Sequence, residues 1–121
     1  MPKVHGKMVI KSREGITSLN VNGIVSLDTW NLYDENHVKY RFFYQDGCLS
    51  FLKTKDDTLN LTFIEGEKTL GSYVFLSQEI VLEIKTEYVK IEAFNIDVKY
   101  TLTSNQDVIN EVVFSLKCEM K

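Results

Sequence analysis

The sequence predicts an all-β protein, an antiparallel up-and-down β-barrel of eight to ten strands that occupies residues 1–121 as a single domain. Three observations lead to this prediction. Apolar and polar residues alternate with a period of two along almost the whole chain, which is typical of strands with one buried face. Short turns rich in Asn, Asp and Gly separate the alternating runs. Finally, a chain of 121 residues is too short to divide into two cores that are each stable alone.

The first three strands are expected at 4–12, 16–25 and 28–33. Charged and glycine-containing turns, Arg13–Gly15 and Asp34–Asn36, delimit them. Hairpin-length connections of this kind favour a meander in which each strand pairs with the next, and closing the meander removes its two exposed edges.

The fourth strand, 37–45, has the most aromatic face of the chain. Val38, Tyr40, Phe42 and Tyr44 share one face, and Lys39, Arg41, Phe43 and Gln45 share the other. Strands 48–54 and 58–65 follow, after the turns Gln45–Gly47 and Lys55–Asp57.

The segment Gly66–Thr69 resembles the Gly-Lys-Thr of a phosphate-binding loop. However, position 61 is Leu where the loop needs glycine, and Glu67 separates Gly66 from Lys68 with a carboxylate that would repel phosphate. The following TLGSYVF predicts a strand, so no helix N-terminus would supply amide donors. We therefore predict a hairpin turn between strands 58–65 and 69–76.

The last three strands are expected at 80–93, 95–104 and 108–118. The first of them is long, and its alternation changes phase around Lys85–Glu87, which predicts a bend or bulge there. The segment 95–104 has the clearest alternation in the chain, and the turn Ser104–Gln106 ends it.

Charge and composition exclude several classes of partner. The net charge is −3 and the Lys and Arg residues are scattered singly, so we expect no nucleic-acid partner. The N-terminal residues contain no apolar signal segment, and no apolar run is long enough to span a membrane. These observations predict a cytoplasmic protein with no membrane partner, in which Cys48 and Cys118 are free thiols.

Several motifs resemble the YwiB-like family of bacterial domains of unknown function. FIEGEKTLGSY fits a Phe-x-x-Gly-x-x-Thr-x-x-x-Tyr pattern, EIVLEIKTEYVKIE resembles a characteristic strand, and IDVKYTL with VVFSLK resembles the closing hairpin. The resemblance implies a calycin-type, lipocalin-like β-barrel, and it brings no established catalytic residues. The chain departs from the pattern between Gly23 and Tyr33, where it is several residues short, so strand pairing there is left open.

No catalytic constellation is visible, and we expect no enzyme activity, no cofactor and no metal site. The two histidines, His5 and His37, lack further ligands or an orienting carboxylate at workable spacing. Cys48 begins a strand with no helix behind it to lower its pKa, so packing is its expected role.

The functional hypothesis is binding of a small apolar or amphipathic molecule in the barrel interior, because barrels of about this size either fill with side chains or hold one ligand. The candidate ligand-binding residues are Tyr40, Arg41, Phe42, Tyr44, Phe63, Tyr73 and Tyr100. Arg41 would bind a ligand carboxylate or phosphate if it pointed inward, but its alternation with Tyr40 and Phe42 predicts that it points outward.

The alternative hypothesis is a protein-interaction or homodimerisation module. An unpaired strand edge near residues 28–33 would expose backbone donors for strand addition. Trp30 and Tyr33 would then anchor the partner, because both residue types are common at interface hot spots.

Overall fold

The protein is a closed antiparallel β-barrel of ten strands, seen in a computed structural model that describes residues 2–121. This confirms the predicted fold class. The strands are β1 (Lys3–Ser12), β2 (Gly15–Ser26), β3 (Thr29–Asp34), β4 (Lys39–Gln45), β5 (Cys48–Thr54), β6 (Thr58–Ile64), β7 (Lys68–Phe75), β8 (Gln78–Glu92), β9 (Asn95–Ser104) and β10 (Asp107–Met120).

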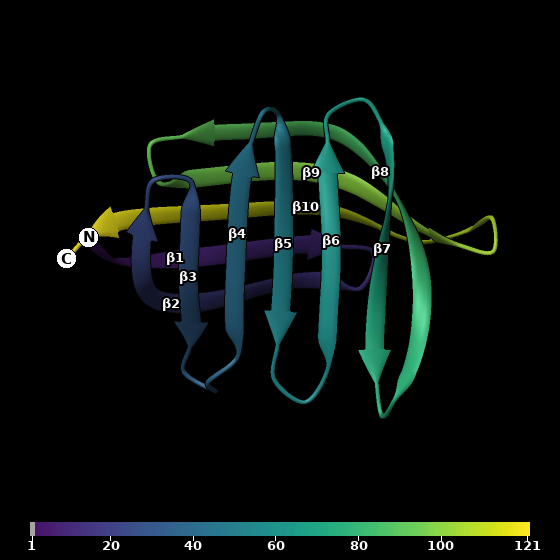
Figure 1. The fold of residues 1–121 in the computed structure, drawn as a ribbon, viewed down its shortest axis with the longest axis horizontal. Helices are drawn as coiled ribbons and strands as arrows, with labels where there is room; N and C mark the ends of the chain where they lie inside the picture. Colours follow the sequence, from purple (N-terminus) through teal and green to yellow (C-terminus); the bar gives the residue numbers. More distant parts are fainter. Residues whose placement is uncertain (1) are drawn as a thin grey trace.

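Each strand pairs with its sequence neighbours, and β1 pairs with β10 to close the barrel, so both chain ends lie together (Figure 1). The observed strand ends lie close to the predicted ones. The fourth strand starts later than expected, at Lys39, because His37 adopts a left-handed backbone with φ of 64° and stays in the turn.

The barrel is flattened into two layers that cross. In Figure 1, β3 to β6 run across β1, β9 and β10, and the strands β2 and β8 pass from one layer to the other. β2 pairs with β1 through most of its length and with β3 through its last six residues, and the backbones of β2 and β3 approach closely at Gly23. β8 turns its corner at a register shift between Thr86 and Tyr88, which confirms the predicted bulge.

The region between Gly23 and Tyr33, where the sequence left pairing open, forms a regular ladder. Gly23 lies opposite Leu32 on β3, and Tyr33 lies opposite Lys39 on β4. Because β3 is paired along both sides, the unpaired strand edge expected near Trp30 is wrong. Closure of the barrel satisfies the backbone groups that strand addition would require.

Gly66 forms the predicted turn between β6 and β7, with φ of 79°. Its amide donates to the carbonyl of Thr86 at 2.8 Å, and the Thr86 amide donates to the carbonyl of Glu67 at 3.2 Å. The turn therefore pairs with β8 at its bulge. β6 and β7 pair with each other only over Thr58–Asn60 on β6 and Ser72–Val74 on β7. The segment closes the wall of the barrel and does not form a phosphate loop.

The inward faces of the strands form one hydrophobic cluster. Phe42 lies at its centre with 1% of its surface exposed, and its ring centroid lies 4.9 Å from that of Phe51 and 5.5 Å from that of Phe114. A second aromatic pair, Phe63 and Tyr100, has centroids 4.7 Å apart. Both cysteines are free thiols, and burial raises the pKa of Cys118 to about 11, so this thiol stays protonated near neutral pH.

Candidate functional site

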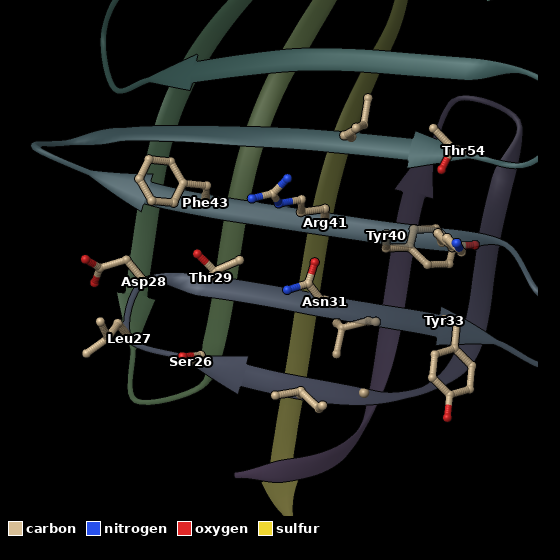
Figure 2. Close-up of a pocket in the computed structure, with 15 residues that line it drawn as sticks. Ser26, Leu27, Asp28, Thr29, Asn31, Tyr33, Tyr40, Arg41, Phe43 and Thr54 are labelled. Carbon is tan, nitrogen blue, oxygen red and sulfur yellow. The ribbon is translucent and has the colours of Figure 1, made fainter. Parts of the chain in front are cut away.

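A wide hollow lies on the outer face of the barrel, over β2, β3, β4 and β5. It has a volume of about 860 Å³ and is shown in Figure 2. We call it the outer groove. It is lined by Gly23, Ile24, Ser26, Leu27, Asp28, Thr29, Asn31, Leu32, Tyr33, Lys39, Tyr40, Arg41, Phe43, Leu52 and Thr54.

The pleat of the strands and their register build this groove. Side chains that point away from the core on four successive strands meet in a row, in which Ile24 faces Asn31, Asn31 faces Arg41, and Arg41 faces Leu52. Figure 2 shows the Arg41 guanidinium near the centre of the groove, between Phe43 and Asn31. The site follows directly from the alternation that buries Trp30 and Phe42 on the opposite face.

Several apolar side chains of the groove are exposed to solvent. Ile24 is 38% exposed, Phe43 39% and Tyr33 51%, and Leu27 at the β2–β3 turn is 96% exposed. Leu27 has a φ of 53°, an uncommon conformation for this residue type, which places its side chain at the rim next to Asp28 and Ser26 (Figure 2). Grouped apolar residues in a concave site are typical of ligand-binding surfaces.

A smaller hollow of about 440 Å³ continues from the outer groove toward β6. Arg41, Phe43 and Leu52 line both hollows. The smaller one also contains the polar side chains of Ser50, Asn60 and Thr62. Arg41 therefore lies at the boundary between a mainly apolar surface and a polar one.

The electrostatics of the outer groove differ from those of the whole protein. The chain carries a net charge of −3, but the groove is lined by two cations, Arg41 and Lys39, and one carboxylate, Asp28. Neither Arg41 nor Lys39 forms an ion pair with any carboxylate in residues 2–121, whereas other basic side chains do. The groove thus presents two cations without ion-pair partners on an acidic protein.

One end of the groove rests on a buried polar cluster around Asp34. The Asp34 carboxylate accepts hydrogen bonds from the Tyr40 hydroxyl at 2.8 Å and from the amides of Asn36 and Val38 at 2.8 Å and 3.1 Å. Burial acts to raise the pKa of Asp34, but the hydrogen bonds and the charge of Lys55 outweigh it and lower the pKa overall. Burial and the Asp34 carboxylate raise the pKa of Tyr40, so the phenol stays a donor.

The candidate ligand-binding residues predicted from the sequence divide between the two faces of the wall. Tyr40, Phe42 and Phe63 are buried in the core, and Tyr44, Tyr73 and Tyr100 are partly buried against it. Arg41 points outward, as its alternation predicts. Of the six other candidates, Tyr40 alone lines the outer groove together with Arg41.

Trp30 does not lie where the interaction hypothesis requires. It is 2% exposed, and its indole Nε1 donates to the carbonyl of Phe94 at 3.0 Å, so it belongs to the core. The prediction that Trp30 anchors a partner is wrong, because strand alternation turns it inward, in phase with Leu32. Tyr33 is exposed as that hypothesis needs, and it lines the outer groove.

Sequence reasoning missed Ile24, Leu27 and Leu52, which no motif marks. Phe43 carried the one available signal, because it is an aromatic residue on the otherwise polar face of 37–45. An apolar residue on the outward face of a strand indicates a surface that a ligand or a partner covers.

The barrel interior contains one polar side chain with no partner among residues 2–121, the hydroxyl of Thr86, which is 1% exposed and faces Tyr100 across β8 and β9. An unsatisfied buried hydroxyl costs about 1–3 kcal/mol. We therefore expect Thr86→Val, which keeps the side-chain shape, to raise the free energy of unfolding by about 1 kcal/mol in urea denaturation. Thr17→Val on the exposed part of β2 is the control, with no expected change. A loss of stability with Thr86→Val would instead mean that the hydroxyl is bonded in solution.

A third hollow, of about 490 Å³, lies over the bulge between β8 and β9. Two of the charged residues that line it form an ion pair, in which the Lys99 ammonium lies 2.8 Å from the Glu87 carboxylate. Within residues 2–121, no group of three potential metal ligands occurs, and no helix is long and apolar enough to cross a membrane.

Comparison with known proteins adds evidence on the architecture. No family model and no curated protein matches the sequence. Among solved structures, the YwiB protein from Bacillus subtilis matches with a TM-score of 0.69, covering 98% of this chain and 90% of that chain. The fold is that of YwiB. The resemblance predicted from the strand and turn motifs is therefore confirmed at the level of the fold. Since the two sequences are 15% identical, similarity to YwiB says nothing further about the outer groove.

Proposed function

We propose that the protein binds a small apolar or amphipathic molecule without catalysing a reaction on it, and that the ligand lies in the outer groove rather than in the barrel interior. The observation that carries the proposal is the concave apolar surface formed by Ile24, Leu27, Tyr33, Phe43 and Leu52 beside unpaired Arg41. Its volume of about 860 Å³ is within the range of small-molecule sites.

The hydroxyls of Tyr40 and Tyr73 support this choice of face, whereas the interior hydroxyl of Thr86 has no partner within residues 2–121. Buried tyrosine hydroxyls would favour an interior ligand if they lacked partners, but the Tyr40 hydroxyl donates to Asp34 at 2.8 Å. The Tyr73 hydroxyl likewise donates to Asp57 at 2.7 Å. The protein itself satisfies these two groups, and a ligand in the interior would have to displace side chains of the packed core.

The proposal is tested by titrating the protein with decanoate and with 1-decanol in isothermal titration calorimetry. We expect binding, and we expect Phe43→Asn to weaken it about tenfold, which corresponds to about 1.4 kcal/mol of lost apolar contact. The matched control is Phe75→Asn. Phe75 is 46% exposed against 39% for Phe43, but it lies at the end of β7 and outside the groove, so we expect no effect there.

Binding that is unchanged in Phe43→Asn would place the ligand elsewhere and contradict the proposal. Light scattering on the same samples tests the homodimer alternative. A stable dimer that Phe43→Asn dissociates would make this face a protein interface instead. Trp30→Ala is unsuitable for that test, because loss of the buried indole would destabilise the fold.

Several expectations from the sequence stay predictions. They include the relationship of the barrel to the calycin and lipocalin class, the bacterial origin implied by the resemblance, the cytoplasmic location, and the absence of enzyme activity and of nucleic-acid and membrane partners. None of them affects the choice of the outer groove.

A further inference from the structure

Arg41 is the charged residue that lines both the outer groove and the smaller hollow beside it. It has the apolar side chains of the outer groove on one side and the polar side chains of Ser50, Asn60 and Thr62 on the other. A molecule with an apolar tail and a polar head would place the head at this boundary if its tail covered the apolar surface.

The immediate neighbours of Arg41 leave its charge uncompensated. The residues opposite it in register are Asn31 on β3 and Leu52 on β5, both neutral. Within residues 2–121, no carboxylate lies within ion-pair distance of its guanidinium, although Arg13 of the same protein pairs with Glu111 at 3.6 Å. A guanidinium presents parallel N–H donors that fit the two oxygens of a carboxylate, and such charge-assisted bonds are about twice as strong as neutral ones.

The row of outward side chains has the length that a tail would need, with the polar Asn31 between Arg41 and Ile24. Ile24 lies two strands away from Arg41 along the row that crosses β4, β3 and β2. With neighbouring strands about 4.8 Å apart, this span is roughly 10 Å, comparable to a medium-length alkyl chain. Leu27 extends the surface at the rim of the groove (Figure 2).

We propose that the ligand of the outer groove is a single-chain amphiphile with a carboxylate head, that Arg41 binds the carboxylate, and that the tail lies over Ile24 and Phe43. This inference rests on the proposed function, since it names the ligand class of the same site. Beyond the proposed function, it names the head group of the ligand and the residue that selects this head group.

The test compares three ligands with the same ten-carbon tail, namely decanoate, 1-decanol and decyltrimethylammonium, in calorimetric titrations below their aggregation concentrations. For the unmodified protein, we expect decanoate to bind at least about tenfold more tightly than 1-decanol. The ammonium ligand should bind more weakly than 1-decanol, because Arg41 and Lys39 repel it.

Two variants identify the residue that selects the head group. Arg41→Gln should remove the preference for decanoate while leaving the affinity for 1-decanol within about twofold. Arg41→Glu should reverse the order, so that decyltrimethylammonium becomes the tightest of the three. Lys7→Gln, which removes an exposed cation on β1 outside the groove, is the control and should keep the original order. Because Arg41 is exposed, we expect both variants to keep the melting temperature of the unmodified protein.

The two proposals fail in different ways. If all three ligands bind equally and Arg41→Gln changes nothing, the carboxylate inference is overturned while binding in the groove stands. If decanoate is preferred but Arg41→Gln keeps the preference, another residue selects the head group and the inference is again overturned. If none of the three ligands binds, the proposed function itself fails.

Discussion

We expect Gly23→Ala to be among the most destabilising single substitutions in this protein, with a loss of about 3 kcal/mol or more in the free energy of unfolding. A Cβ atom at position 23 would overlap the backbone oxygen of Asn31 and lie 2.8 Å from the Cα of Leu32. Both are backbone atoms of β3, so no side-chain rotation relieves the overlap, and β2 and β3 must separate. For a chain of this length, the melting temperature should fall by roughly 10 °C or more.

The control for this substitution is Asn22→Ala, which changes the neighbouring residue on β2 and makes none of these contacts. We expect it to shift stability by no more than about 0.5 kcal/mol. Gly23 also lines the outer groove, so Gly23→Ala should weaken decanoate binding at temperatures where the variant is still folded. A variant as stable as the unmodified protein would contradict the close approach of β2 and β3.

We expect Asp34→Ala to destabilise the protein by about 3 kcal/mol at pH 7, since it leaves the buried Tyr40 hydroxyl and two amides without their acceptor. Asp34→Asn keeps the side-chain shape and one acceptor oxygen, so its loss should be about half as large. Tyr40→Phe removes only the donor, and we expect about 1.5 kcal/mol. Urea denaturation monitored by tryptophan fluorescence measures all three. Equal stability of Asp34→Ala and the unmodified protein would show that the cluster is not formed.

The stabilisation by the Asp34 carboxylate should decrease at acid pH. The pKa of Asp34 is lower in the folded protein than its ordinary value of 3.8, so its contribution to stability is complete above that value. The contribution is lost as the pH falls from 3.8 through the lowered pKa of the folded state. The stability gap between the unmodified protein and Asp34→Asn should therefore be constant from pH 5 to 7 and shrink below about pH 4. A gap that widens with acid would contradict the lowered pKa.

The sequence predicts the barrel well because alternation encodes which face of each strand is buried. Phe42, Phe63 and Phe114 all lie inside as the alternation requires, and even the bulge of β8 is visible as a change of phase near Lys85. The role of Trp30 was harder to predict, because its hydrophobicity suits a core and an interface equally well. Its burial follows from the face of β3 on which it lies, the inward face that it shares with Leu32.

The outer groove could not be predicted in the same way, because its residues come together through the registers of four strands. Ile24, Arg41 and Leu52 form a row only once β2, β3, β4 and β5 are aligned. A shift of one residue in any ladder would turn one of them inward. The sequence left the pairing of β2 with β3 open, so this row could not be predicted from it. Phe43, an aromatic residue on the polar face of β4, was the one indication of an apolar outer surface.

The location of a bound amphiphile tests the central claim most directly. Nuclear Overhauser contacts between the methylene protons of decanoate and the methyl groups of the protein distinguish the two faces of the wall. We predict contacts with Ile24, Leu27 and Leu52, which line the outer groove, and none with Leu49, Leu61 and Ile84, which are buried in the core. Contacts with the methyl groups of Leu61 and Ile84 would place the ligand inside the barrel and contradict the account.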